Sequence, residues 1–162
     1  MTSPLDQIAP AFMEMAHRIV WATAATVAPD GRPWTRILHP LWTWDGSQLT
    51  GLIATAPAPL KRAHLETTPN ISLTYWQPNQ DTCSANCAAE WDLSPEGRQA
   101  GWNALATAPA PVGYDPSIVP GWDAPTSDSF AILRLTPWWL RVMPGTAMLE
   151  GKGDVATWSA VR

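Results

Sequence analysis

The sequence predicts one mainly β domain over residues 1–162: a small antiparallel barrel of about six or seven strands with a few peripheral helices. Short runs rich in β-branched and aromatic residues alternate with turn residues. The first three runs have no helix between them, which excludes a parallel doubly wound sheet. With 46% hydrophobic residues and 11 tryptophans, the 162-residue chain can bury a core.

An amphipathic helix is expected at the start of the chain, over residues 5–18. Ile8, Phe12, Met15 and Ile19 recur at intervals of three to four residues, which places them on one helical face. We expect that face to cover a sheet.

Three antiparallel strands are expected next. The segment 19–28 is rich in β-branched and aromatic residues, and residues 29–32, PDGR, form a turn into a second strand over 34–44. A second turn at Asp45-Gly46 leads into a third strand over 48–55.

The stretch 51–73 predicts a strand, a helix and a strand in succession, and we expect the sheet to be organised around it. Proline is tolerated in the first helical turn, so the helix begins near Pro59 and closes before Pro69. Lys61 and Arg62 then lie at the helix N-terminus, where free N–H groups favour an anion. The pair indicates a phosphate or carboxylate site, and two solvated surface charges are the alternative.

The second half of the chain predicts further strands and one helix. We expect strands over 70–76, 82–91 and 130–143, a helix from Ser94 to about residue 105, and a possible last strand over 157–159. Pro137 interrupts the long strand, as is typical of an edge strand or a bulge. The connection 107–128 holds five prolines. Such long loops are often functional, and proline-rich packing on the surface is the alternative.

The charge balance argues against two classes of partner. Ten Lys and Arg residues against 14 Asp and Glu residues give a net charge of -4, so the chain lacks the dense basic surface of proteins that bind nucleic acid or anionic membranes. No apolar run is long enough to span a bilayer, and the first ten residues lack the pattern of a secretory signal. We therefore expect a cytoplasmic protein.

The two cysteines are expected to be free structural thiols. If 82–91 is a strand, the Cα atoms of Cys83 and Cys87 are about 13 Å apart, which is beyond disulfide reach. A metal site would need more cysteine or histidine at ligand spacing, and the three histidines are scattered. No metal site is expected.

Four motifs follow one another between residues 19 and 142. They are the hairpin ATVAPDGRPWTRIL, the pattern K-x-x-x-L-x-x-x-P-x-x-x-L from Lys61 to Leu73, AAEWD at 88–92, and FAILRLTPW at 130–138. In this order and spacing they resemble the pyridoxamine 5′-phosphate oxidase-like family, the FMN-binding split barrels, including its flavin/deazaflavin-dependent branch. The resemblance implies a split β-barrel and a homodimer with a flavin-type cofactor between the subunits.

The resemblance also implies the residues that hold the cofactor phosphate. Lys61 would bind it, assisted by Thr55 at the end of the third strand and by Arg62. Arg36 matches the family's arginine on the second strand. For Arg36 the alternative is a strand residue whose charge reaches water.

The same resemblance places the flavin ring. The backbone of Ile37 and Leu38 would run along the ring edge and tune it through hydrogen bonds. Trp139 or its neighbour Trp138 could stack on the ring, and burial in a core or dimer interface is the alternative. The resemblance assigns no catalytic residue. His39 and His64 are candidate proton donors, His39 being the better placed, with a structural role as the alternative.

Two departures from the family pattern bear on the cofactor. Pro59 and Leu60 precede the lysine where many FMN-binding members have a hydroxyl residue, and Leu41 replaces a second lysine of the oxidases. Fewer donors then face a doubly charged phosphate. FMN is the expected cofactor, and the deazaflavin coenzyme is the alternative.

We therefore expect an oxidoreductase that transfers hydride to or from a small conjugated substrate through FMN. A deazaflavin-dependent reductase is the second hypothesis, and a non-catalytic split barrel that binds flavin, haem or tetrapyrrole is the third. Oxidation of pyridoxamine phosphate is not expected, because the chain shows no second cationic cluster for that substrate's own phosphate. The segment 107–128 is a candidate cover for the substrate pocket.

Overall fold

Eight strands and four α-helices make up the described part of the chain, residues 4–160, in this computed structural model. The strands are β1 (Ala22–Val27), β2 (Pro33–Leu38), β3 (Leu41–Trp44), β4 (Leu49–Thr55), β5 (Asn70–Trp76), β6 (Thr82–Asp92), β7 (Ala131–Met143) and β8 (Ala156–Ser159). The helices are α1 (Leu5–Ile19), α2 (Pro59–Thr67), α3 (Pro95–Thr107) and α4 (Gly145–Glu150), with one 3₁₀ turn at Pro116–Ile118.

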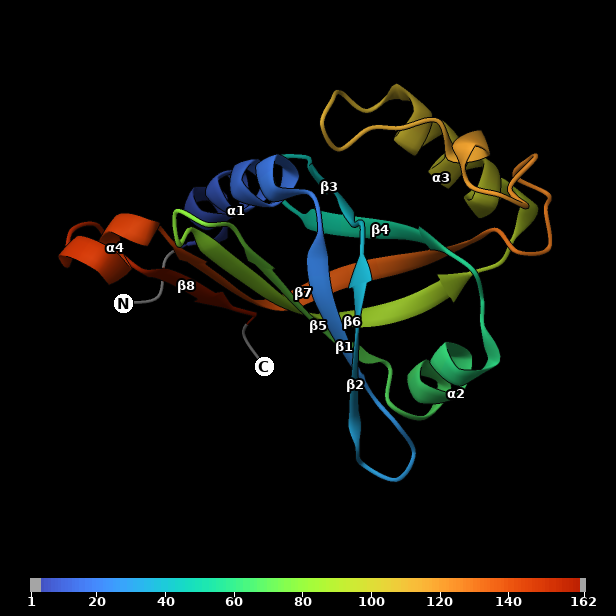
Figure 1. Ribbon diagram of the computed structural model, residues 1–162, viewed down its shortest axis with the longest axis horizontal. Coiled ribbons are helices and arrows are strands. Elements are labelled where there is room, and N and C mark those ends of the chain that lie inside the picture. Colours follow the sequence, from blue (N-terminus) through green and yellow to red (C-terminus); the bar gives the residue numbers. More distant parts are fainter. Residues whose placement is uncertain (1–3, 161–162) are drawn as a thin grey trace.

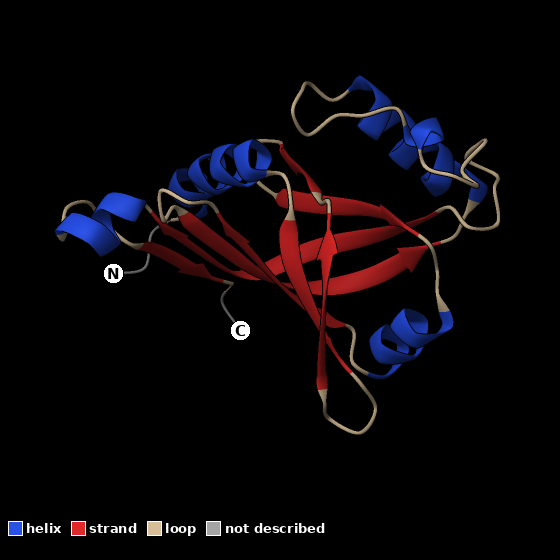
Figure 2. Ribbon diagram, in the orientation of Figure 1, coloured by secondary structure: helices blue, strands red, loops and turns tan. Residues whose placement is uncertain are grey.

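All eight strands belong to one antiparallel sheet. Its order is β2-β1-β5-β6-β7-β4-β3, and β8 pairs with β7. Figure 1 shows that the sheet is strongly twisted and that the β1–β2 hairpin extends away from its body. The helices lie at the periphery of the strands (Figure 2). The end strands β2 and β3 do not pair with each other, so the sheet coils without closing. This confirms the predicted mainly β split barrel.

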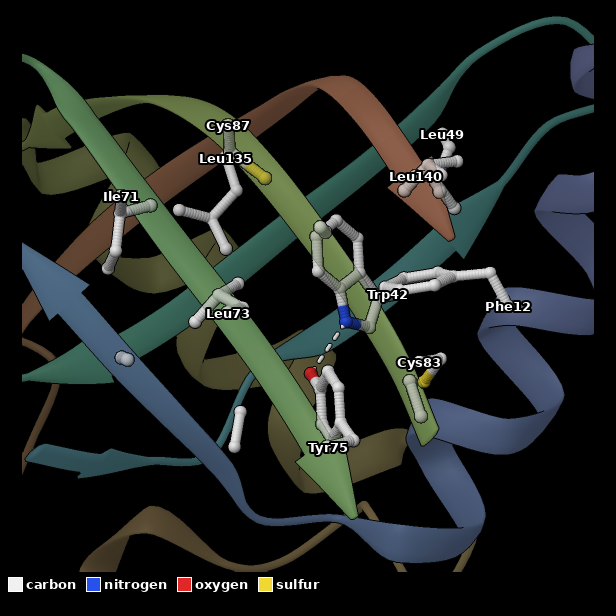
Figure 3. Packing of buried hydrophobic residues seen from close by; sticks show 14 of the residues in the cluster. Phe12, Trp42, Leu49, Ile71, Leu73, Tyr75, Cys83, Cys87, Leu135 and Leu140 are labelled. Carbon is white, nitrogen blue, oxygen red and sulfur yellow. Dashed lines mark hydrogen bonds between the residues drawn. The ribbon is translucent and has the colours of Figure 1, made fainter. Parts of the chain in front are cut away.

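The core lies between α1 and the sheet. As predicted, α1 buries Ile8, Phe12 and Met15. The ring centroids of Phe12 and Trp42 are 5.0 Å apart in an edge-to-face arrangement, and Trp42 Nε1 donates a hydrogen bond of 2.9 Å to the hydroxyl of Tyr75 (Figure 3). Aromatic side chains bury large apolar areas, and this bond satisfies the buried polar atoms of two of them.

The predicted strand over 34–44 is wrong as one element. The structure divides it into β2 and β3, separated by His39 and Pro40. Proline has no N–H to donate to a strand ladder, so Pro40 ends the pairing of β2 with β1. The chain then crosses to the other end of the sheet, where β3 pairs with β4. The break leaves residues 37–39 at the end of β2, a strand that pairs with β1 on one edge and has no partner strand on the other.

Pro137 marks a bulge in β7, one of the two predicted interpretations. Asn86 pairs with Trp139 and Cys87 with Pro137, so Trp138 is the extra residue. β7 as a whole is not an edge strand, because β6 pairs with one side of it and β4 and β8 pair with the other. Pro137 itself lies between the residues that pair with β4, 131–135, and those that pair with β8, 139–142, so locally it has a partner strand on one side alone. Both cysteines of β6 are free and buried, as predicted.

The strand–helix–strand stretch is confirmed with small changes at its ends. Helix α2 begins at Pro59, the expected position, and β5 covers the predicted residues 70–76. The predicted N-cap of α3 is also present, because the Ser94 side chain accepts a hydrogen bond from the Gly97 N–H. The short helix α4 was not predicted, and β8 confirms the possible last strand.

Candidate functional site

Lys61, in the first turn of α2, is the centre of a cationic cluster. Its Nζ donates hydrogen bonds to Thr55 Oγ1, at the end of β4, and to the Ala56 carbonyl at 3.2 Å. The same atom lies 5.9 Å from the centroid of the Trp91 ring. No side chain caps the N-terminus of α2. The N–H groups of its first turn therefore remain free for an outside acceptor.

Arg36 on β2 is the second cation of this cluster. Its Nη1 donates a 2.8 Å hydrogen bond to Thr26 Oγ1, and that hydroxyl lies 2.9 Å from Nδ1 of His64 on α2. Thr26 and His64 are fully buried, and within residues 4–160 His64 Nε2 has no hydrogen-bond partner. This chain of contacts fixes the Arg36 guanidinium beside the start of α2. It leaves one buried donor or acceptor unused.

The positive charge of the cluster is not neutralised within the described residues. Neither Lys61 nor Arg36 forms an ion pair in residues 4–160. Burial, together with the charge of Arg36, lowers the pKa of Lys61 to about 8. Burial also lowers the pKa of Arg36. A bound anion would favour the charged form of both side chains, so the cluster is suited to a phosphate or carboxylate.

Raising the pH from 8 to 10 is expected to stabilise the ligand-free protein through Lys61. The pKa of Lys61 is about 8 in the folded state against an ordinary value of 10.5, so in this window the unfolded state binds more protons. Stability therefore rises with pH. Burial raises the pKa of the Cys83 and Cys87 thiols, which acts in the opposite direction. Urea unfolding should therefore compare wild type with Lys61→Met, and identical pH slopes would contradict the prediction.

A cavity of about 560 Å³ lies next to the cationic cluster. Ile37 and Leu38 line it directly after Arg36 along β2, and Ala54 lines it directly before Thr55 on β4. The remaining wall comes from Val20 and Trp21, which precede β1, from His39, and from the loop 107–128. Its full lining is Val20, Trp21, Ile37, Leu38, His39, Ala54, Pro111, Tyr114, Ile118, Val119 and Trp122. One extended ligand could thus reach both the cations and the cavity.

The loop 107–128 supplies part of the lining of this cavity, and its role as a cover for a substrate pocket stays a prediction. It first folds back on α3, because the Tyr114 N–H donates to the Leu105 carbonyl at 3.0 Å. At this turn a Cβ on Gly113 would lie 1.8 Å from the Ala108 carbonyl oxygen, so glycine is required. His39 Nε2 then donates a 2.7 Å hydrogen bond to the Val112 carbonyl. The loop is therefore fixed to the end of β2.

His39 is held as a loop anchor. Its ring centroid lies 5.0 Å from that of Trp21 and 4.9 Å from that of Tyr114. The Val112 carbonyl can only accept, so Nε2 carries the ring proton. Burial lowers the pKa of His39, which favours the neutral imidazole. The neutral ring has no second proton to transfer, and this geometry supports the structural alternative for His39.

The comparisons with known proteins bear on the fold. No protein-family model and no curated protein matches this sequence. Among solved structures, one similar protein is related to general stress protein 26 of B. subtilis (pyridoxinephosphate oxidase family), from Clostridium acetobutylicum. Its TM-score is 0.71 at 12% identity, over 95% of both chains. The protein has the pyridoxamine 5′-phosphate oxidase-like split-barrel fold.

Two further split barrels show the same likeness. A pyridoxamine 5′-phosphate oxidase-related, FMN-binding protein from Nostoc punctiforme has a TM-score of 0.64 at 15% identity, over 99% of this chain and 98% of the other. An F420 reductase has a TM-score of 0.54 at 16% identity, over 80% of this chain and 94% of the other. The first of these aligns over nearly the whole of the chain. At such identities the likeness establishes the fold alone.

Two residues expected to bind the cofactor make their observed contacts outside the cluster of this split barrel. Arg62 pairs with Glu66 at 3.4 Å, while its Nε is buried without a hydrogen-bond partner in residues 4–160, and its role stays a prediction. Trp139 pairs with Asn86 on β6 and with Ser159 on β8. Lys61 instead contacts Trp91, which is five residues, or about 16 Å, further along β6 than Asn86. The role of Trp139 stays a prediction that depends on a second subunit.

Several site residues of the split barrel were not found from the sequence. Thr26 connects β1 to Arg36 and to His64, which the sequence offered only as a candidate proton donor, and Tyr114 and Trp122 line the cavity. The hairpin motif contained Thr26, but a threonine in a strand carries no signal of its own.

No helix in residues 4–160 has the length and apolar character needed to cross a membrane. Residues 4–160 also contain no group of three or more His, Cys, Asp or Glu side chains that could hold a metal ion.

Proposed function

We propose that this protein is an oxidoreductase of the pyridoxamine 5′-phosphate oxidase-like family, which binds FMN and transfers hydride to or from a small conjugated substrate. One observation carries the proposal. Lys61 and Arg36, two cations without ion-pair partners in residues 4–160, lie beside a cavity without charged side chains. This arrangement suits a ligand whose anionic end meets the cations and whose flat ring lies at the mouth of the cavity, as the phosphate and the flavin ring of FMN could.

The residues present fit the phosphate of FMN. Lys61 Nζ, the Thr55 hydroxyl and the uncapped N–H groups of α2 can all donate to it, and Arg36 adds a second positive charge. The unpartnered Nε2 of His64 is a buried polar atom beside the same cluster. When bound, FMN would supply the hydride chemistry, and this chain would bind, orient and shield it.

The free edge of β2 fits the flavin ring. This strand is at the end of the sheet order and pairs only with β1. Part of its backbone N–H and C=O groups therefore points away from the sheet. At Ile37 and Leu38 these groups can meet the ring edge at the mouth of the cavity.

The proposed assembly is a homodimer with the cofactor between the subunits. Three large apolar side chains around the cluster are exposed in the single chain: Trp34 at 49%, Ile37 at 60% and Leu60 at 50%. A second copy would cover such a surface. In this dimer Trp139 would contact the cofactor bound by the partner subunit.

The deazaflavin coenzyme is a second candidate cofactor. The F420 reductase among the structural neighbours supports it. Arg62 pairs with Glu66, and α2 begins with Pro59 and Leu60 rather than with a hydroxyl residue, so the phosphate of FMN meets fewer donors than the family pattern supplies. This candidate places a different flavin-like ring at the mouth of the same cavity.

The test is the absorption spectrum of the purified protein, followed by separate titrations with FMN and with the deazaflavin coenzyme. About one flavin per chain, reduced and then reoxidised by a conjugated acceptor, is the expected result. Uptake of the deazaflavin coenzyme but not FMN would select the second candidate. Tight binding of either cofactor without consumption of any electron donor or acceptor would select a non-catalytic binding protein.

A further inference from the structure

The cavity beside the cationic cluster is lined without a single Asp, Glu, Lys or Arg. Aromatic rings from Trp21, Tyr114 and Trp122 face it, together with the ring of His39. Burial lowers the pKa of His39, so the neutral imidazole is favoured as well. A charged group held against this lining, away from Lys61 and Arg36, would lose its hydration without gaining a counter-charge. The lining therefore selects against charged ligands.

Tyr114 supplies a hydrogen-bond donor that nothing else uses. Its hydroxyl makes no hydrogen bond to another residue of the range 4–160 and is not among the fully buried polar atoms, so a ligand can reach it, whereas the buried Tyr75 hydroxyl accepts from Trp42. Burial raises the pKa of Tyr114 to about 12, so the hydroxyl stays protonated. Its ring packs against His39, which is itself fixed to Val112. The donor is thus held at a defined position in the wall of the cavity.

We propose that this cavity binds a neutral, conjugated carbonyl compound, whose oxygen accepts a hydrogen bond from the Tyr114 hydroxyl and whose flat ring packs on Trp21 and Trp122. As the substrate site of the oxidoreductase, this inference rests on the proposed function. The inference that the cavity binds this class of compound depends only on the residues that line it. A hydrogen bond to a carbonyl orients the ligand, and the aromatic walls suit a planar one.

The experiment measures equilibrium binding of three probes of similar shape to the protein with and without FMN. The probes are 1-acetonaphthone, a neutral ketone; 1-ethylnaphthalene, which lacks the oxygen; and 1-naphthoate, which is an anion. The ketone is expected to bind at least roughly tenfold more tightly than the naphthoate, because the anion meets no counter-charge. FMN is expected to leave ketone binding in place.

Two variants locate the probe. Tyr114→Phe is expected to weaken ketone binding roughly fivefold and to leave ethylnaphthalene unchanged, because only the ketone loses a hydrogen bond. Ile118 lines the cavity and is exposed, so Ile118→Lys can add a cation at little cost in folding. This variant is expected to favour naphthoate over the ketone, the reverse of wild type.

Three results would overturn the inference. They are equal affinity of wild type for the ketone and the naphthoate, equal losses of ketone and ethylnaphthalene in Tyr114→Phe, and displacement of the ketone by FMN, which would assign the cavity to the flavin ring. FMN binding is measured in a separate titration, so that it can be compared with ketone binding. A protein that binds FMN but not the ketone rejects this inference alone, whereas one that binds the ketone but neither FMN nor the deazaflavin coenzyme rejects the proposed oxidoreductase and keeps the ligand class.

Discussion

Lys61→Ala is expected to weaken FMN binding by roughly 10- to 100-fold, because hydrogen bonds to charged groups contribute about 1.5–3 kcal/mol. Lys61 has no ion-pair partner in residues 4–160, and it stands at an uncapped helix N-terminus beside Arg36. The phosphate of FMN would be its counter-charge. Quenching of flavin fluorescence in a titration with protein measures the dissociation constant directly.

The chain supplies its own control for this variant. Lys152 is the only other lysine in the sequence, and it is an exposed residue that pairs with Glu150 at 3.2 Å. Lys152→Ala is therefore expected to bind FMN as wild type does. Riboflavin, which lacks the phosphate, provides the matching ligand control. Unchanged FMN affinity in Lys61→Ala, or an equal loss of riboflavin affinity, would contradict the assignment of Lys61 to the phosphate.

The cation at the start of α2 could be predicted from the sequence because its determinants are local. Pro57, Pro59 and Pro69 mark the limits of the helix, and the structure keeps them. The place of Arg62 could not be predicted in the same way. Successive residues of a helix point about 100° apart, so the sequence does not decide whether Lys61 and Arg62 face the same ligand. In the structure Arg62 pairs with Glu66.

The cavity could not be predicted, because it depends on contacts between distant segments. His39 and Val112, whose hydrogen bond fixes the loop, are separated by 73 residues. Thr26 and His64 are separated by 38. The break at Pro40 was visible in the sequence, but strand-like residues on both sides of it concealed the crossing to β3. Local sequence patterns thus identify the strands and helices. The pairing of β2 with β1 and of β3 with β4, which those patterns do not reveal, decides which strand ends lie together around the cavity.

Trp42→Ala is expected to lower the free energy of unfolding by about 3–5 kcal/mol. The side chain is 2% exposed, and it packs between Phe12 of α1 and the sheet. Its loss opens a large cavity and also removes the donor to the fully buried Tyr75 hydroxyl. Urea unfolding measures the change. Trp76→Ala is the matched control, because Trp76 is 55% exposed, and it should cost less than about 1 kcal/mol.

Trp42→Phe separates the stability of the core from the chemistry of the site. Phenylalanine keeps an aromatic ring near Phe12 but leaves the Tyr75 hydroxyl without its donor, so we expect a loss of about 1–3 kcal/mol. Trp42 lies on β3, and Gly51 of the neighbouring β4 packs closely against its ring, at the opposite end of β4 from Thr55. The variant should therefore bind FMN with unchanged affinity wherever it is folded. A parallel loss of FMN affinity would show that packing around Trp42 also positions Thr55 and Lys61.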